Sequence, residues 1–200
     1  MRRLVKFLFL LLGLFIVFRF WPASELRHAP GILVAGDPNQ TAITPASLGE
    51  VDGFQLTAVA LYEITARVLH TKHYRGGAAS RLVPFDVAVG WGPMSDQAVL
   101  DQLDISQSNR FFFYSWEGAP PIDKTVLAGH SANMHLIASN RSVANGIGAL
   151  KSGEVVAIIG YLVNAAGPEG FYWNTSLSRT DTGNGACELL YVTAIRPAEQ

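Results

Sequence analysis

The hydrophobic pattern of the chain begins with a run of twelve residues, 7–18, that carry no polar side chain and lie between Lys6 and Arg19. Counted with its flanks from residue 4 to residue 21, the segment would extend roughly 27 Å as a helix, close to the thickness of the hydrocarbon layer of a bilayer. The aliphatic stems of the two basic residues can reach toward lipid headgroups. The pattern therefore predicts a signal anchor, a membrane-spanning helix within residues 1–22.

Two other interpretations of this segment stay open: a cleaved signal peptide, and a helix that lies in the membrane interface. Signal-peptide cleavage requires small residues near the site. Cuts after Ala23 or Ala29 would place Trp21 or Arg27 at the third position back, so an uncleaved anchor is favoured. Basic residues ahead of the span predict that the N-terminus stays in the cytoplasm and that the rest is exported.

Residues 23–50 contain repeated prolines and glycines, which end a helix before it can grow. We expect this stretch to be a tether. Its one apolar island, residues 32–35, could add a strand to the domain or stay loose. The folded domain is then expected over residues 51–198, a length that suits a single domain.

Apolar and polar residues alternate along residues 54–74. A period of two predicts a strand whose apolar positions share one face: Leu56, Ala58, Ala60, Tyr62, Ile64, Ala66 and Val68. A helix remains the alternative, with a different apolar stripe: Leu61, Ile64, Val68 and Leu69.

Shorter elements follow. Apolar and aromatic runs predict further strands at residues 85–92, 110–116, 154–164, 171–176 and 187–195, with Gly160 at a bulge or bend. Short helices are expected after Ser95, which would cap a helix with Asp96 in its first turn, and at residues 142–150. Residues 76–80 are expected to form a loop, and residues 125–128 an apolar segment leading to His130. Many short strands with brief helices predict a mainly β, α+β domain, built as a small partly open barrel or as a sandwich.

Charge narrows the range of partners. From residue 20 onward the chain holds eleven basic and sixteen acidic residues, a net charge of minus five. Because neutralisation of phosphates supplies most of the affinity of nucleic-acid-binding proteins, an acidic exported domain predicts no nucleic-acid partner. The expected partners are the lipid bilayer, through residues 4–21, and another envelope protein or a small ligand. No cofactor is expected.

Cys187 is the only cysteine, so no internal disulfide can form. A thiolate nucleophile needs a nearby histidine and a cation, which His130 and Arg196 could supply. The sequence VLAGH, a Lys-Ser-Gly turn, a strand, and then a cysteine and an arginine resembles the order found in sortases, which are membrane-anchored β-barrel transpeptidases. The resemblance implies a cysteine transpeptidase or hydrolase that uses these three residues. Sortases carry their cysteine at the end of a strand, whereas Cys187 opens one.

Other candidate residues are polar groups near predicted turns. His130 and His135 are candidate metal ligands only if the backbone between them is irregular, because an offset of five residues separates their side chains on a helix or a strand. His70 and His73 share a face only on a helix. Trp91 and Ser95 border a turn and a helix start that could contact a ligand. Arg179 and Asp181 lie in a polar loop that could do the same.

A broader resemblance covers most of the domain from about residue 62 onward. The phrases GWGPMSD, HSANMHLI and GACELLYV, together with SLSRTDTG, resemble those of an uncharacterised family of membrane-anchored bacterial exported proteins. The resemblance implies a bacterial inner-membrane protein with a periplasmic domain, and it implies no activity. The leading hypothesis is a non-catalytic domain for ligand or partner binding or for envelope assembly. The sortase-like enzyme is the alternative, and a metal site at His130 and His135 is a third hypothesis.

Overall fold

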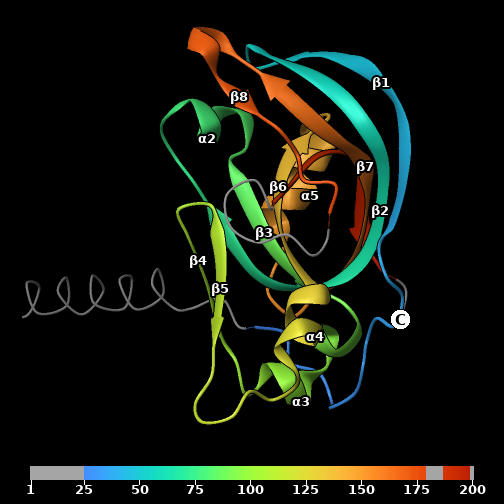
Figure 1. Cartoon of the computed structure of the whole chain (residues 1–200), viewed down its shortest axis with the longest axis vertical. Helices are drawn as coiled ribbons and strands as arrows, with labels where there is room; N and C mark the ends of the chain where they lie inside the picture. The colour runs from blue at the N-terminus through green and yellow to red at the C-terminus, as the bar shows by residue number, and fades with distance from the viewer. Residues whose placement is uncertain (1–24, 179–186, 199–200) are drawn as a thin grey trace, which may run out of the picture.

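The computed structural model describes residues 25–178 and 187–198 (Figure 1). Within these ranges strands predominate and helices are short, so the predicted mainly β, α+β fold class is confirmed. The strands are β1 (Asn39–Val51), β2 (Phe54–His73), β3 (Phe85–Gly90), β4 (Asp104–Ser108), β5 (Phe111–Ser115), β6 (Ser131–Ala138), β7 (Val155–Ala166), β8 (Tyr172–Trp173) and β9 (Glu188–Pro197). The helices are α2 (Ala78–Leu82), α3 (Gln97–Leu100), α4 (Lys124–Gly129) and α5 (Arg141–Ala149), with the 3₁₀ turns η1 (Gly92–Ser95) and η2 (Pro168–Gly170).

The segment predicted to span the membrane, residues 4–21, lies outside the described residues. Across residues 25–178 and 187–198, no helix combines the length and the apolar character that crossing a bilayer requires. The anchor therefore stays a prediction from the sequence.

Five strands pair in a closed ring. Strand β2 pairs with β3, β3 with β6, β9 with β7, and β7 with β2, all antiparallel, whereas β6 and β9 are parallel. The ring closes because β2 is twenty residues long, so that its first part pairs with β7 and its last part with β3. Strands β1 and β8 extend the same sheet beyond the ring.

The strand predicted over residues 54–74 is confirmed as β2, and the helical alternative is not adopted. Its even-numbered positions from Phe54 to Val68 are all buried, as the alternating pattern requires. Two register shifts, at Ala58/Ala60 and Val68/His70, interrupt the ladders with β7 and β3. Such bulges bend a strand, which helps one long strand to serve both sides of the ring.

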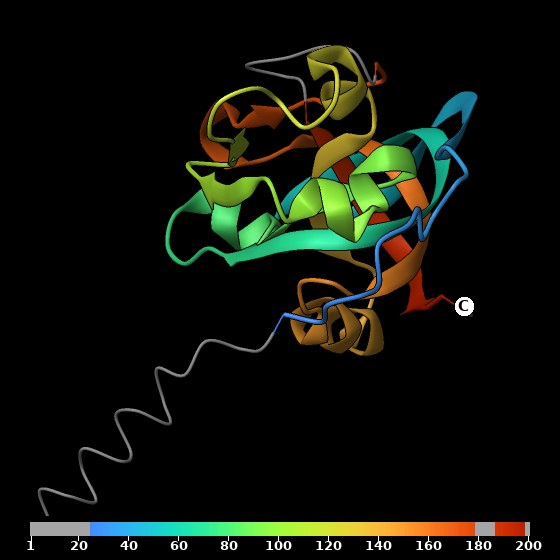
Figure 2. The ribbon, with the colours of Figure 1, turned by 90° about the horizontal axis from the view of Figure 1, so that it is seen from below.

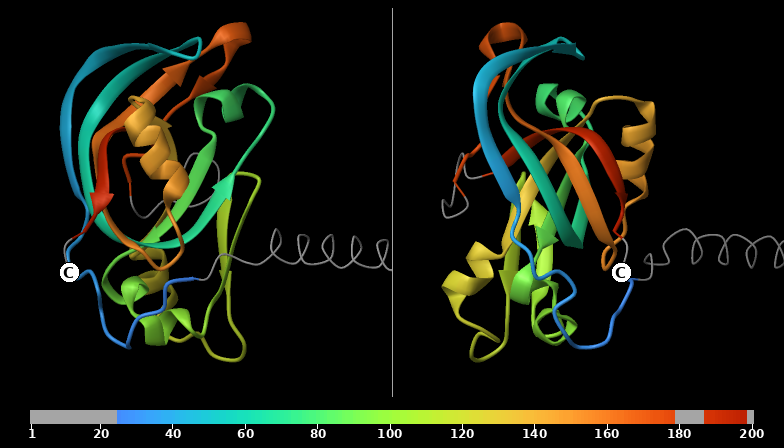
Figure 3. Two further views of the ribbon diagram at one scale, coloured as in Figure 1. Left: turned by 180° about the vertical axis from the view of Figure 1, so that it is seen from behind. Right: turned by 90° about the vertical axis from the view of Figure 1, so that its right-hand side faces the viewer.

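The two faces of the sheet carry different groups. The first core lies on one face and includes Val87 and Val89 of β3 together with Val143 and Ile147 of α5, which packs against the sheet (Figure 3). Because neighbouring residues of a strand point to opposite faces, Asp86 and Ala88 of β3 lie on the other side of the sheet. We call this side the outer face. Helix α3 and helix α5 lie on opposite sides of β2 (Figure 2).

The tether predicted over residues 23–50 is wrong for the described part of that stretch. Residues 39–51 form β1, which pairs along β2, and residues 25–38 lie against the η1–α3 segment without regular structure. The side chain of Ser95 accepts hydrogen bonds from the amides of Leu33 (3.1 Å) and Val34 (3.0 Å), and Val34 is buried. Proline and glycine exclude a helix here, but they do not exclude an extended chain whose amides find acceptors elsewhere.

Several predicted boundaries move. Asp96 rather than Ser95 caps α3, because its carboxylate accepts the amide of Ala98 at 2.8 Å. The segments at residues 125–128 and 142–150 belong largely to α4 and α5, and α2 occupies part of the expected loop at residues 76–80. Of the strand predicted at residues 171–176, only β8 forms. The other predicted strands agree with β3, β5, β7 and β9 within a few residues, whereas β4 and β6 were not predicted. Gly160 lies at a register shift between β7 and β9.

Strands β4 and β5 form a separate two-stranded sheet that contacts β2 and β6. A two-residue turn joins them, and both of its residues, Asn109 (φ 51°) and Arg110 (φ 70°), adopt positive φ angles. This conformation suits the twist of a tight hairpin but is unfavourable for an arginine. The rest of the fold must therefore hold Arg110 in place.

Replacing Ser95 with alanine is expected to loosen residues 33–34 of the N-terminal segment on the domain. Two amides of residues 33 and 34 would lose their acceptor, and unsatisfied buried donors cost about 1–3 kcal/mol. Hydrogen exchange at Leu33 and Val34 should accelerate, while exchange in β2 stays slow. Ser142→Ala, at an exposed position of α5, is the matched control and should leave exchange unchanged. Equal protection of residues 33 and 34 in the Ser95→Ala variant would contradict this role.

Candidate functional site

Polar residues occupy two neighbouring rows on the outer face of β2, β3 and β6. In the first row, Ala88 pairs with His70 on one side and with Asn133 on the other. In the second row, Asp86 of β3 pairs with His135 of β6. Because residues that pair across strands share a face, this register brings together groups that are far apart in the sequence.

Arg110 covers the second row from the turn between β4 and β5. Its Nη1 atom lies 2.7 Å from Oδ1 of Asp86, whose side chain is fully buried. The Nδ1 atom of His135 lies 2.8 Å from the same oxygen, in ion-pair contact but outside the geometry of a hydrogen bond. We call Asp86, Arg110 and His135 the Arg110 cluster.

Arg110 makes further contacts around Asp86. Its guanidinium donates to the carbonyl of Val83 (2.9 Å) and to the hydroxyl of Ser80 (3.0 Å), and it lies 4.0 Å from the ring centre of Tyr74. The backbone amide of Arg110 donates to the hydroxyl of Tyr74 at 3.0 Å, and burial raises the pKa of that tyrosine. A buried carboxylate needs such a partner, so Arg110 both balances the charge of Asp86 and fixes the hairpin on the sheet.

A chain of side-chain amides runs along the first row. Gln107 of β4 donates to Oδ1 of Asn133 at 2.5 Å, and Asn133 donates through Nδ2 to the carbonyl of Arg110 at 2.8 Å. The Oε1 atom of Gln107 lies 2.9 Å from Nδ1 of His70. Both amides are buried. Ala88 lies between His70 and Asn133 in this row, and its small side chain leaves room for Gln107 to bridge them.

The polarity of this amide chain fixes the state of His70. A backbone carbonyl can only accept, so the amide of Asn133 must direct its nitrogen to Arg110 and its oxygen to Gln107. Gln107 must then donate to Asn133 and present its own oxygen to His70. His70 therefore carries a hydrogen on Nδ1, and in its neutral form Nε2 is an acceptor that bonds to no residue within 25–178 and 187–198.

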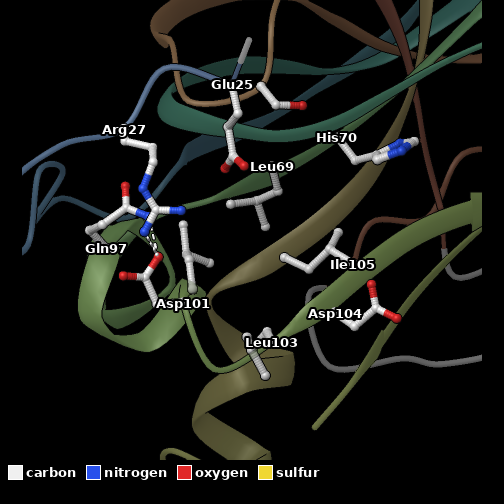
Figure 4. Close-up of a pocket in the computed structure, with 11 residues that line it drawn as sticks. Glu25, Arg27, Leu69, His70, Gln97, Asp101, Leu103, Asp104 and Ile105 are labelled. Carbon is white, nitrogen blue, oxygen red and sulfur yellow. Dashed lines mark hydrogen bonds and ion pairs between the residues drawn. The ribbon is translucent and has the colours of Figure 1, made fainter. Parts of the chain in front are cut away.

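His70 lines an open pocket of about 490 Å³ (Figure 4). The pocket lies where residues 25–27, β2, α3, the beginning of β4 and the turn before β7 meet, and its residues are Glu25, Arg27, Leu69, His70, Gln97, Leu100, Asp101, Leu103, Asp104, Ile105 and Ser152. Asp101 forms an ion pair with Arg27 (2.6 Å) and accepts a hydrogen bond from the side chain of Gln97 (2.7 Å). A neighbouring cavity of about 520 Å³ shares Asp101, Leu103 and Asp104 with it.

Arg67 supports the wall of this pocket from inside the protein. Its side chain is fully buried, and it donates to the carbonyl of Ser95 (3.1 Å) and to Oε1 of Gln97 (2.5 Å). Burial lowers the pKa of Arg67. Gln97 also accepts the amide of His28 at 3.0 Å, so the same side chain joins α3 to the N-terminal segment.

The structure does not bring together the three residues of the sortase-like hypothesis. Cys187 immediately precedes β9 and directs Sγ to the carbonyl of Arg110 at 3.8 Å. Arg196 pairs with Ala157 near the other end of β9. Nine residues of strand place it roughly 30 Å from Cys187. His130 lies before β6, with Nδ1 at 2.8 Å from the carbonyl of Val126.

The other predicted site residues are placed as follows. His130 and His135 do not meet, because the second belongs to the Arg110 cluster and the first packs against Gly92. His73 stacks on Phe85, with 4.5 Å between the ring centres. It does not line the pocket that His70 lines. Across residues 25–178 and 187–198, no three histidine, cysteine or acidic side chains are placed to hold a metal ion.

Trp91 and Ser95, expected at a ligand-contacting loop, bind the N-terminal segment instead. The indole of Trp91 is buried and donates to Oδ1 of Asp37 at 2.9 Å, and Ser95 is fully buried beneath residues 33–34. Arg179 and Asp181 lie outside the described residues.

Sequence reasoning did not identify Asp86, Gln107, Asn133 or Arg110. One signal was present: Asp86 interrupts the apolar run FDVAVG, and a charge inside a buried strand demands a partner. The identity of that partner depends on the fold, because Arg110 is more than twenty positions away.

Comparisons with known proteins find no match to the chain: no protein-family model, no curated protein and no solved structure is similar to it at a significant level.

Proposed function

We propose that this chain is a membrane-tethered, extracytoplasmic binding domain, without catalysis of its own, whose pocket beside His70 takes a small ligand rich in hydrogen-bond donors. The observation that carries the proposal is the buried amide chain that holds His70 at the pocket, where Nε2 bonds to none of the described residues. Ligand sites are typically pockets of about 300–1,000 Å³ with a few well-placed polar groups, and this pocket fits that description.

The membrane attachment in this proposal is the anchor predicted at residues 4–21. The apolar length suits a bilayer, and the basic residues before it favour a cytoplasmic N-terminus. The domain then lies on the far side of the bacterial inner membrane, in the periplasm. Carbonate extraction of membranes and C-terminal reporter fusions test this placement, which predicts an active alkaline phosphatase fusion.

The order of strands supports a binding role. The ring β2–β3–β6–β9–β7, with its parallel β6–β9 pair and with α5 between β6 and β7 along the chain, resembles the arrangement of the OB-fold, a small partly open barrel. OB-fold domains bind ligands on the face of their second and third strands, which here are β3 and β6. A shared fold does not establish a function, so the likeness adds only to the geometry of the site.

In this chain the hairpin β4–β5 covers that face. Arg110 bonds to Oδ1 of Asp86, and Asn133 bonds to Gln107 and to the carbonyl of Arg110, so the hairpin engages polar groups that would otherwise be open to a ligand. His70 lies at the end of the same polar face, at the edge of the hairpin. Gln107 contacts its Nδ1 atom, and the residue lines the pocket. Binding at the pocket therefore uses the part of the face that the hairpin does not fill.

The chemistry of the pocket selects donors. Neutral His70 offers an acceptor nitrogen, and the carboxylates of Glu25 and Asp104 make no ion pair with any residue that the structure describes. A primary amine can donate to all three of these groups, whereas a carboxylic acid anion would be repelled by the two carboxylates.

Binding of n-butylamine to the full chain in detergent micelles tests the proposal, with acetate as the anionic comparison. We expect saturable binding of the amine and none of acetate by calorimetric titration. His70→Ala should weaken amine binding about tenfold, because loss of one hydrogen bond to a charged group corresponds to about 1.5–3 kcal/mol. His73→Ala is the matched control and should change affinity less than about twofold. Equal weakening in the two variants, or no saturable binding, would overturn the proposed site.

A further inference from the structure

We propose that the ligand of the pocket beside His70 is the headgroup of a phospholipid that carries both a primary amine and a phosphate, as phosphatidylethanolamine does. This inference rests on the proposed membrane anchor and pocket, and it names the ligand. Three observations support it: the position of the pocket relative to the predicted span, the fixed attachment of the N-terminal segment, and the distribution of charge in the pocket.

The pocket begins close to the predicted end of the span. Glu25 lines it, and Trp21 is the last residue of the apolar segment. Four residues of fully extended chain reach at most about 14 Å. Headgroups occupy roughly 5–8 Å on each side of the hydrocarbon layer. The wall of the pocket at Glu25 therefore lies in or just above the headgroup layer.

The described start of the N-terminal segment, residues 26–28, is attached to the domain next to the pocket. The amide of Leu26 donates to the carbonyl of Ser152 at 2.9 Å, and the ring of His28 lies 2.8 Å from the carbonyl of Gly153. Arg27 pairs with Asp101 at 2.6 Å. These contacts fix residues 26–28 on the domain, so the wall of the pocket at Glu25 stays within the short reach of chain that follows the predicted span. The side chain of Leu26 is half exposed beside it and suits contact with the interface.

Charge in the pocket is divided between two sides. Figure 4 shows Arg27 with Asp101 on one side and His70 with Asp104 on the other, and Leu69 and Ile105 lie between them. The pair Arg27–Asp101 uses only one guanidinium nitrogen of a largely exposed side chain, so further donors of Arg27 are available to a phosphate.

A headgroup with an ammonium and a phosphate matches both sides. The ammonium donates to Nε2 of His70 and to the carboxylate of Asp104, while the phosphate pairs with Arg27. A choline headgroup has no N–H donor, and a glycerol headgroup has no positive charge to balance the carboxylates. The pocket should therefore rank ethanolamine above choline and above glycerol headgroups.

The test is the thermal unfolding of the full chain in detergent micelles with three single-chain lipids: lysophosphatidylethanolamine, lysophosphatidylcholine and lysophosphatidylglycerol. We expect the ethanolamine lipid to stabilise the protein at about one tenth of the concentration that the other two require. Asp104→Asn should remove this preference, whereas Arg27→Gln should weaken stabilisation by all three lipids, because each of them carries the phosphate. Glu63→Gln, an equal loss of charge at an exposed position of β2, should preserve the preference.

The outcomes separate this inference from the proposed function. Equal stabilisation by the three lipids, with n-butylamine still bound in a manner that depends on His70, overturns the lipid headgroup and leaves the pocket. Loss of both effects overturns the pocket as well. Stronger competition by a trilysine peptide than by lysophosphatidylethanolamine would also overturn the lipid assignment, in favour of a basic protein segment.

Discussion

Replacing Arg110 with methionine is expected to lower the free energy of unfolding by about 3–5 kcal/mol, because removal of one partner of a buried ion pair leaves the other charge uncompensated. Asp86 is fully buried, and Arg110 supplies the hydrogen bond to its Oδ1 atom. The same substitution removes the bonds that hold the hairpin turn on Ser80 of α2 and on Val83, which follows that helix. Urea unfolding of the full chain in detergent, followed by tryptophan fluorescence, measures the loss.

Two further variants show whether charge is the cause. Asp86→Val combined with Arg110→Met should recover a large part of the lost stability, because an apolar pair needs no compensation. Arg75→Met removes an arginine from an exposed position nearby and should change stability by no more than about 0.5 kcal/mol. A loss below about 1 kcal/mol in Arg110→Met would contradict a structural role for the Arg110 cluster.

Replacing Gly160 with alanine is expected to destabilise the protein by about 3 kcal/mol, at the upper end of the usual effect of overpacking. Gly160 lies in β7 between Tyr62 of β2 and Val192 of β9, at the register shift. A Cβ atom there would overlap the backbone carbonyl of Tyr191, which cannot move without disturbing the ladder. Both strands that hold β7 in the ring would be affected.

The matched control is Gly129→Ala at the end of α4. A Cβ atom there meets no neighbour, and Gly129 does not have a positive φ angle. Alanine should therefore leave stability unchanged or raise it by about 0.4–1 kcal/mol. If Gly160→Ala were as stable as Gly129→Ala, the close approach of β7 and β9 at residue 160 would be wrong.

The sequence predicted the elements whose signal is local. Alternation identifies β2, an apolar run with a glycine identifies β7 and its bulge, and the aromatic run identifies β5. The prediction of a tether at residues 23–50 was wrong because proline and glycine exclude a helix but do not exclude an extended, bonded chain. The amides that the segment needs to bond are satisfied by Ser95 and Asp96, more than sixty residues further along the chain.

The site could not be derived from the sequence because it depends on strand register. Asp86 meets His135 only when β3 and β6 pair as they do, and a shift of one residue would turn either side chain to the other face. His70 was considered only together with His73, because a shared face on a helix is the pattern that sequence spacing can reveal. On a strand the two point to opposite sides, and the partner of His70 is Gln107 on a different sheet.

The most direct test of the proposed site is the state of the His70 ring, measured by nitrogen NMR of the full chain labelled at its five histidines. The spectrum would be recorded in micelles at about pH 8.5, where an ordinary imidazole is neutral. His70→Ala assigns the signal. We predict a hydrogen on Nδ1, an unprotonated Nε2, and a shift of Nε2 when n-butylamine is added; Gln107→Leu should remove the preference for this tautomer. A hydrogen on Nε2 of His70 in the unliganded protein, or an unchanged Nε2 signal with amine, would contradict the site.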